Sequence, residues 1–193
     1  MERIDDMKKM QDAEVIFWKL YGTNWVCENY MIRRNYMRFF IVNLNNNYVP
    51  PYPKEWYGIL DEKSLSRKRA FQMPKHLLFP IENNMQTVIT DIIMFPVFMV
   101  TEMVMEVIKK YDPFLPFVRV IFFDRKNKRS MVYYLPFLEE LECICKKENA
   151  DLVLDKEKIV GKVIGKVKDK KSKTHIVMRM DLTESILRRN AVG

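Results

Sequence analysis

Hydrophobic and polar positions alternate most clearly in the last third of the chain, where they predict two β-hairpins. In residues 117–135, two runs rich in aromatic and β-branched side chains flank the polar segment 124–130. In residues 162–180, two further runs flank the polar segment 168–174. Strand-forming runs separated by a short polar stretch are typical of antiparallel hairpins. Both predicted hairpins carry basic tips.

A helical pattern follows Thr101, which is a favourable N-cap residue. Apolar residues then recur at intervals of three and four positions as far as Tyr111, and Glu102 lies in the first turn. Asp112 and Pro113 follow as a stop signal. The pattern predicts an amphipathic helix that packs on a sheet.

A second helix is predicted in the last sixteen residues. Asp181 and Glu184 have the spacing of a capping box, and Arg188 and Arg189 complement the negative end of the helix. Gly193 stands where a left-handed residue often ends a helix. Because such a glycine usually turns the chain into another element, we expect that the chain is a fragment or has lost a final strand.

The order of elements determines the predicted fold class. Residues 37–44 and 74–80 predict further extended segments, and the chain lacks the alternating strand and helix rhythm of a parallel sheet. We therefore predict an α+β fold, with a largely antiparallel twisted sheet built from hairpins and two or three packed helices. Residues 37–193 form the predicted single domain. Residues 1–36 are an extension of uncertain structure, for which a hairpin and a broken helix both remain open.

The composition of the chain indicates in which cellular compartment the protein is expected. The chain has 193 residues, of which 48% are hydrophobic, which is enough to build a core. No apolar run approaches the ~20 residues of a membrane span, and the N-terminus lacks the apolar segment of a signal peptide. Three cysteines are too few for a disulfide framework. We expect a cytoplasmic protein that does not associate with a membrane.

Charge is distributed unevenly along the chain. The net charge is +8, and residues 112–193 hold eighteen basic and twelve acidic residues. This excess suits either an acidic or nucleic-acid partner or a lysine-rich solubilising surface. The interspersed acidic residues favour the second interpretation, since nucleic-acid sites concentrate one sign on one face.

Candidate catalytic and metal-binding groups are sparse. Cys143 and Cys145 with His175 would supply three ligands, whereas a structural zinc site requires four. No sequence feature places His76 near a nucleophile, and the five glycines form no phosphate-binding loop. We therefore expect no catalytic residues, no metal site and no cofactor, and we predict that the protein is not an enzyme.

Three blocks of sequence carry a resemblance to a known family. They are residues 95–113, residues 133–141 and residues 180–189, and the step at 152–155 lies between the second and third. In their order and spacing these blocks resemble the small immunity proteins of bacterial polymorphic toxin systems, in particular the family numbered eleven. The resemblance implies a non-enzymatic α+β module of the cytoplasm that binds and neutralises a cognate secreted toxin.

The chain departs from the family pattern in three places. Residues 1–36 precede the resembling region, and the chain ends at Gly193, where we expect a few more residues in a strand. Gly165 stands where a bulky residue would be expected to pack better. These departures bear on whether the domain is complete.

The net positive charge of the chain suggests a neutral or acidic toxin, because complementary charge steers association. The predicted toxin-binding residues are those of the densest basic clusters and of the second hairpin tip: Arg67, Lys68, Arg69, Arg125, Lys126, Lys128, Arg129, Lys170 and Lys171.

Two alternatives remain open. The first is a nucleic-acid-binding module that uses the basic hairpin tips. The second is a structural or regulatory interaction module in which residues 1–36 drive oligomerisation. The oligomeric state is not predicted.

Overall fold

The computed structural model describes residues 20–21, 24–25, 39–43, 48–60, 65–82, 87–142, 156–169 and 172–192. Most of the N-terminal extension lies outside these ranges. Within it, β1 (Leu20–Tyr21) pairs antiparallel with β2 (Asn24–Trp25), which corresponds to the hairpin alternative.

Five strands form the larger sheet, in the order β4-β7-β8-β6-β5. All neighbouring strands are antiparallel except β4 and β7, which are parallel. The strands are β4 (His76–Pro80), β5 (Ile92–Ile93), β6 (Met99–Val100), β7 (Phe117–Asp124) and β8 (Arg129–Pro136). The hairpin predicted in residues 117–135 is thus confirmed as β7 and β8.

A second sheet has the order β3-β10-β9, with both pairs antiparallel. Its strands are β3 (Phe39–Val42), β9 (Ile164–Lys168) and β10 (Thr174–Arg179). The second predicted hairpin is confirmed as β9 and β10.

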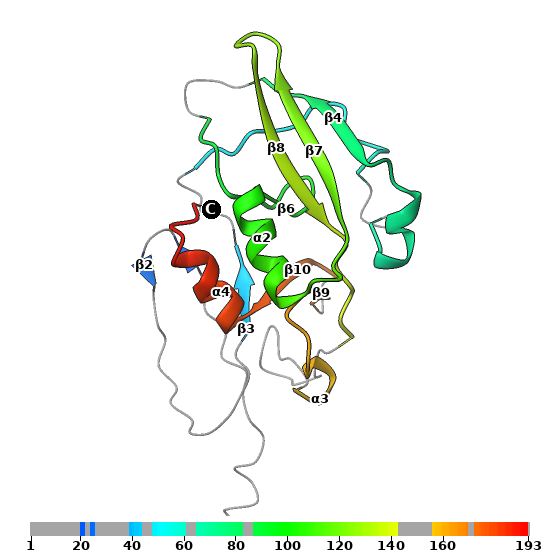
Figure 1. The fold of residues 1–193 in the computed structure, drawn as a ribbon, viewed down its shortest axis with the longest axis vertical. Coiled ribbons are helices and arrows are strands. Elements are labelled where there is room, and N and C mark those ends of the chain that lie inside the picture. Colours follow the sequence, from blue (N-terminus) through cyan, green and yellow to red (C-terminus); the bar gives the residue numbers. More distant parts are fainter. Residues whose placement is uncertain are drawn as a thin grey trace, which may run out of the picture.

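Helices α2 (Glu102–Tyr111) and α4 (Met180–Leu187) lie side by side next to the two sheets (Figure 1). The short elements α3 (Lys156–Ile159) and η2 (Arg67–Gln72) complete the described helices. The predicted α+β class with mainly antiparallel pairing is confirmed. In the part of the chain that the structure describes, no helix is long and apolar enough to cross a membrane.

The core has a separate cluster on each face of the larger sheet. On one face, Phe79 from β4, Phe122 from β7 and Tyr133 from β8 are buried together. On the other face, residues of α2 such as Ile108 pack with Leu182 of α4 and with buried side chains of the smaller sheet. Along β7, buried residues that join the first cluster alternate with less buried ones, since successive strand residues point to opposite faces.

The start of α2 is held by an aspartate outside the helix. Thr101 occupies the predicted N-cap position, but its hydroxyl donates to Asp91 Oδ1 at 2.7 Å and makes no capping bond. Asp91 Oδ2 accepts the backbone N–H of Val192 at 2.8 Å. Asp91 therefore joins the start of α2 to the segment that follows α4.

The capping box predicted for α4 is wrong. The helix begins at Met180, the N-cap position belongs to Arg179, and Asp181 lies in the first turn. Strand β10 runs directly into the helix, so Arg179, with its extended backbone, is both the last residue of the strand and the N-cap residue of the helix. The left-handed residue after the helix is Asn190, with φ of 56°. Gly193 lies outside the described residues.

The expectation for Gly165 is also wrong. Gly165 pairs in regular register with Val177 of β10. It leaves no room for a bulky side chain, because a Cβ atom there would lie 2.5 Å from Leu141 Cδ1. A glycine at this position allows the segment around Leu141 to pack against β9.

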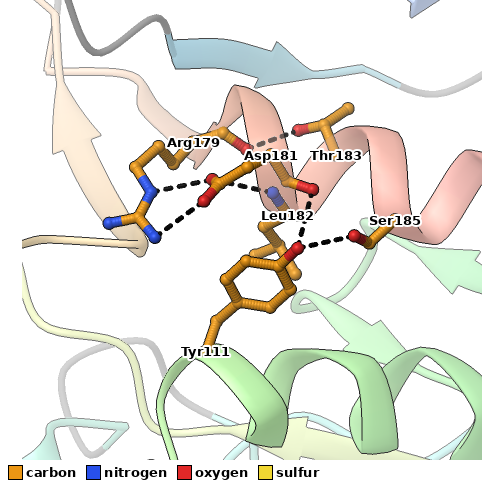
Figure 2. Close-up of polar contacts among 6 residues, drawn as sticks. All are labelled: Tyr111, Arg179, Asp181, Leu182, Thr183 and Ser185. Atoms are coloured by element: carbon orange, nitrogen blue, oxygen red, sulfur yellow. Dashed lines mark hydrogen bonds and ion pairs between the residues drawn. The ribbon is translucent and has the colours of Figure 1, made fainter.

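Tyr111 links the end of α2 to the start of α4 (Figure 2). Its hydroxyl donates to the carbonyl oxygen of Asp181 at 3.1 Å and lies 2.6 Å from Ser185 Oγ. The Arg179 guanidinium lies over the tyrosine ring at 6.0 Å and binds the Asp181 carboxylate through two nitrogens. This polar cluster fixes the two helices relative to each other.

Candidate binding surface

Residues 124–129, called the hairpin tip below, connect β7 to β8 at one end of the molecule (Figure 1). Asp124 begins the tip and is only 2% exposed. Its Oδ1 accepts the backbone N–H groups of Lys126 and Asn127 at 3.0 and 3.1 Å. Its Oδ2 accepts Nδ2 of Asn127 at 2.7 Å. The buried carboxylate therefore fixes the conformation of the turn.

Four predicted contact residues gather on the hairpin tip. Arg125, Lys126, Lys128 and Arg129 are all exposed, while the acidic group of the tip is buried. The Arg125 guanidinium lies 5.5 Å from the centroid of the Phe123 ring. The tip thus presents four cationic side chains on a turn whose backbone is held in place.

A surface cavity of about 770 Å³ lies beside the hairpin tip. Lys54 and Glu82, which both line the cavity, form an ion pair at 2.7 Å. The cavity has charged side chains of both signs at its wall. Its lining residues are Lys54, Glu55, Pro80, Ile81, Glu82, Asp124, Arg125 and Lys126.

The basic cluster at Arg67, Lys68 and Arg69 lies in η2, away from the hairpin tip. In the chain, η2 precedes the start of β4. Because β4 is parallel to β7, the end of β4 lies beside the end of β7, where the hairpin tip begins. Arg67 donates to the carbonyl oxygen of Phe114 at 3.1 Å and lies 3.7 Å from Asp112. It therefore has a structural role. Arg69 is exposed, and the side chain of Lys68 lies outside the described part.

The second hairpin also has an aspartate at the start of its turn. Asp169 accepts the backbone N–H of Lys173 at 2.8 Å through Oδ1, and its Oδ2 lies 3.0 Å from Nε2 of His175. Lys170 and Lys171 fall outside the described residues, so their predicted role stays untested.

The metal-binding alternative gains no support from the described residues. His175 contacts Asp169, and Cys143 and Cys145 lie outside the described ranges. Among the residues that the structure describes, no three His, Cys, Asp or Glu side chains are grouped to hold a metal ion.

Some of the lysines in the last third of the chain form ion pairs with glutamates. Lys162 lies 2.7 Å from Glu139, and Lys168 lies 2.8 Å from Glu140. The hydrogen bond and charge of Lys162 lower the pKa of the Glu139 carboxyl, and the charge of Arg67 adds to the effect. The positive charge around β9 is therefore interrupted by carboxylates.

The outer side of β4 is a feature that the sequence analysis did not identify. Leu77 and Phe79 are buried, whereas Leu78 between them is 63% exposed. The sequence signal for this feature was Leu78 itself, an apolar residue at a position where the alternation of a half-buried strand predicts a polar one. We call the outer backbone edge from His76 to Leu78 the open edge.

Comparison with known proteins adds nothing to this description, since no family model, no curated protein and no solved structure matches the chain. The class that the structure defines is therefore an α+β protein with two mainly antiparallel sheets and a projecting, positively charged hairpin tip.

Proposed function

We propose that this protein is a non-enzymatic immunity protein of the bacterial cytoplasm, which binds and neutralises a cognate toxin. The observation that carries the proposal is the hairpin tip. Four cationic side chains stand exposed on a turn that the buried Asp124 holds in one conformation.

A tip of this kind suits a protein partner. A turn that is ordered before binding loses less conformational entropy in a complex. Arginine and aromatic side chains are enriched in protein interfaces, and Arg125 and Phe123 provide such a pair. The positive charge favours a toxin with an acidic contact surface, through complementary steering.

The position of the family-like blocks is compatible with this proposal. Val104 from residues 95–113, Leu138 from residues 133–141 and Leu182 from residues 180–189 belong to one buried cluster. The resemblance therefore lies in residues that build the scaffold. The hairpin tip lies outside the three blocks, as expected for a surface that is adapted to one particular toxin.

Nucleic-acid binding is the second candidate, and the exposed cations of the hairpin tip favour it. Against it, carboxylates are paired with Lys162 and Lys168, so the described surface around β9 carries no continuous positive stripe. The two functions differ in salt dependence. Affinity for nucleic acid falls steeply as salt rises, because bound counterions are released.

The proposal is tested by co-purifying the protein with the product of the gene adjacent to its own, and by measuring growth of cells that express that product. We expect a stable complex and rescue of growth. A Lys126→Glu, Lys128→Glu variant should bind roughly ten- to a hundred-fold more weakly. The matched control, Lys110→Glu with Arg188→Glu, makes the same charge change at two exposed residues outside both hairpin tips and should bind like the wild type.

If the wild-type protein neither associates with that product nor rescues growth, the proposal is overturned. Tight binding to duplex nucleic acid that weakens steeply with salt would support the second candidate.

A further inference from the structure

The hydrogen-bonding directions of β4 follow from two bonds at its end. The N–H of Ile81 donates to the carbonyl oxygen of Phe123 at 3.0 Å, so Ile81 faces β7. The carbonyl oxygen of Pro80 accepts the N–H of Lys54 at 2.8 Å, so Pro80 faces away from β7. Since backbone direction alternates along a strand that is paired on one side, His76 and Leu78 also direct their N–H and C=O groups outward.

Among the described residues, backbone contacts on this side of β4 lie at the end of the strand. The segment at Lys54 reaches Pro80, and Pro53 forms an isolated bridge with Ile81. Among the described residues, no strand pairs with β4 between His76 and Leu78 on the side away from β7. Outward backbone groups beside an exposed leucine form a template on which another strand can add.

We propose that the open edge binds an extended segment of the partner protein, which adds to the larger sheet as a further strand beside β4. This inference rests on the proposed function, since the partner is the cognate toxin. Main-chain hydrogen bonds to His76 and Leu78 hold the segment.

The side chains beside the open edge indicate the chemistry of the segment. Leu78 is exposed and lies in register with Ile121 of β7, so an apolar side chain of the segment packs there. His76 lies in register with Arg119, which is exposed, and Lys75 is exposed just before β4. The segment therefore pairs an apolar residue with an acidic one close by.

Amide hydrogen exchange of the wild-type protein, alone and with the product of the adjacent gene, tests this inference directly. We expect exchange at His76 and Leu78 to slow by about ten-fold or more in the complex. The amides of Leu77 and Phe79 face β7 and are protected in both states. Unchanged exchange at His76 and Leu78 in a formed complex would overturn the open-edge inference and leave the proposed function intact.

Two variants at one position separate the backbone from the side chain. Leu78→Ala removes the exposed side chain and keeps the outward N–H. Leu78→Pro also removes that N–H, which β7 does not use, and proline is tolerated on edge strands. We expect Leu78→Pro to bind about three- to ten-fold more weakly than Leu78→Ala, which corresponds to one hydrogen bond. Equal binding by two folded variants would contradict strand addition.

The remaining outcomes are also decisive. If the wild-type protein forms no complex, the proposed function and this inference both fail. If His76 and Leu78 become protected in the protein alone as its concentration rises, the open edge pairs with a second copy of the chain, and the assignment to a toxin segment is wrong.

Discussion

Asp124 and Gly165 show how single residues position the larger elements. The Asp124 carboxylate is buried, and its two oxygens accept hydrogen bonds from three donors of the turn. Gly165 lacks the one atom that would collide with Leu141. In both cases, the neighbouring atoms explain why this residue type stands at this position.

Replacing Asp124 with alanine should destabilise the protein and weaken partner binding. The change leaves the N–H groups of Lys126 and Asn127 without their acceptor, at a cost of about 1–3 kcal/mol in the free energy of unfolding. Urea denaturation and titration with the partner measure the two effects. Asp124→Asn is the control, because its amide oxygen still accepts a hydrogen bond, and it should lie between alanine and the wild type. A fully stable Asp124→Ala protein would refute the structural role.

Replacing Gly165 with alanine should cost about 1–3 kcal/mol, the usual range for overpacking a filled core. The cost should fall sharply when Leu141 is also alanine, because the colliding atoms are then absent. Urea denaturation of the two single variants and the double variant gives the coupling energy between the sites. Additive effects would show that Gly165 is not required by contact with Leu141.

At the scale of elements, the junction of β10 and α4 depends on an ion pair that the sequence concealed. Asp181 has the spacing of a capping box with Glu184, yet its carboxylate binds the Arg179 guanidinium at 2.7 and 2.9 Å. Spacing along the chain alone does not distinguish a cap from an ion pair within the first turn. The boundary of α4 is decided by β10, whose pairing with β3 extends to Arg179.

The ion pair predicts a pH dependence. The hydrogen bond from Arg179 lowers the pKa of the Asp181 carboxyl. A carboxyl whose pKa is lower in the folded protein adds stability above its unfolded pKa of about 3.9, and this stability is lost as the pH falls through the folded pKa. Asp181→Asn should therefore lose less stability than the wild type between about pH 5 and about pH 2.

Urea midpoints across this pH range measure the effect. Arg179→Gln is the companion variant, since it removes the cause of the lowered pKa and keeps the carboxyl. Both variants should show a shallower loss of stability in acid than the wild type. Parallel curves for all three proteins would contradict the role assigned to the pair.

The existence of the longer strands was predictable, whereas their pairing was only partly so. The β7–β8 and β9–β10 hairpins follow from local alternation and a polar turn. The parallel pairing of β4 with β7 and the separation of β3, β9 and β10 into a second sheet depend on contacts between residues far apart in sequence. Local pattern contains little information on such contacts.

At the scale of the whole molecule, the fold gives the predicted basic clusters different roles. Arg125, Lys126, Lys128 and Arg129 remain exposed together on the hairpin tip, whereas Arg67 is bound to the loop after α2. The sequence predicts the clusters because charge is visible in it. It does not predict the open edge, because an edge exists only once the order of strands is known.

The central claim is that the protein neutralises a toxin by binding it, and calorimetric titration with the product of the adjacent gene tests this most directly. We predict saturable binding in the nanomolar range or tighter, which corresponds to about −12 kcal/mol or stronger. Binding should weaken only moderately as salt rises. Absence of measurable heat at micromolar concentrations, together with no complex on gel filtration, would contradict the account.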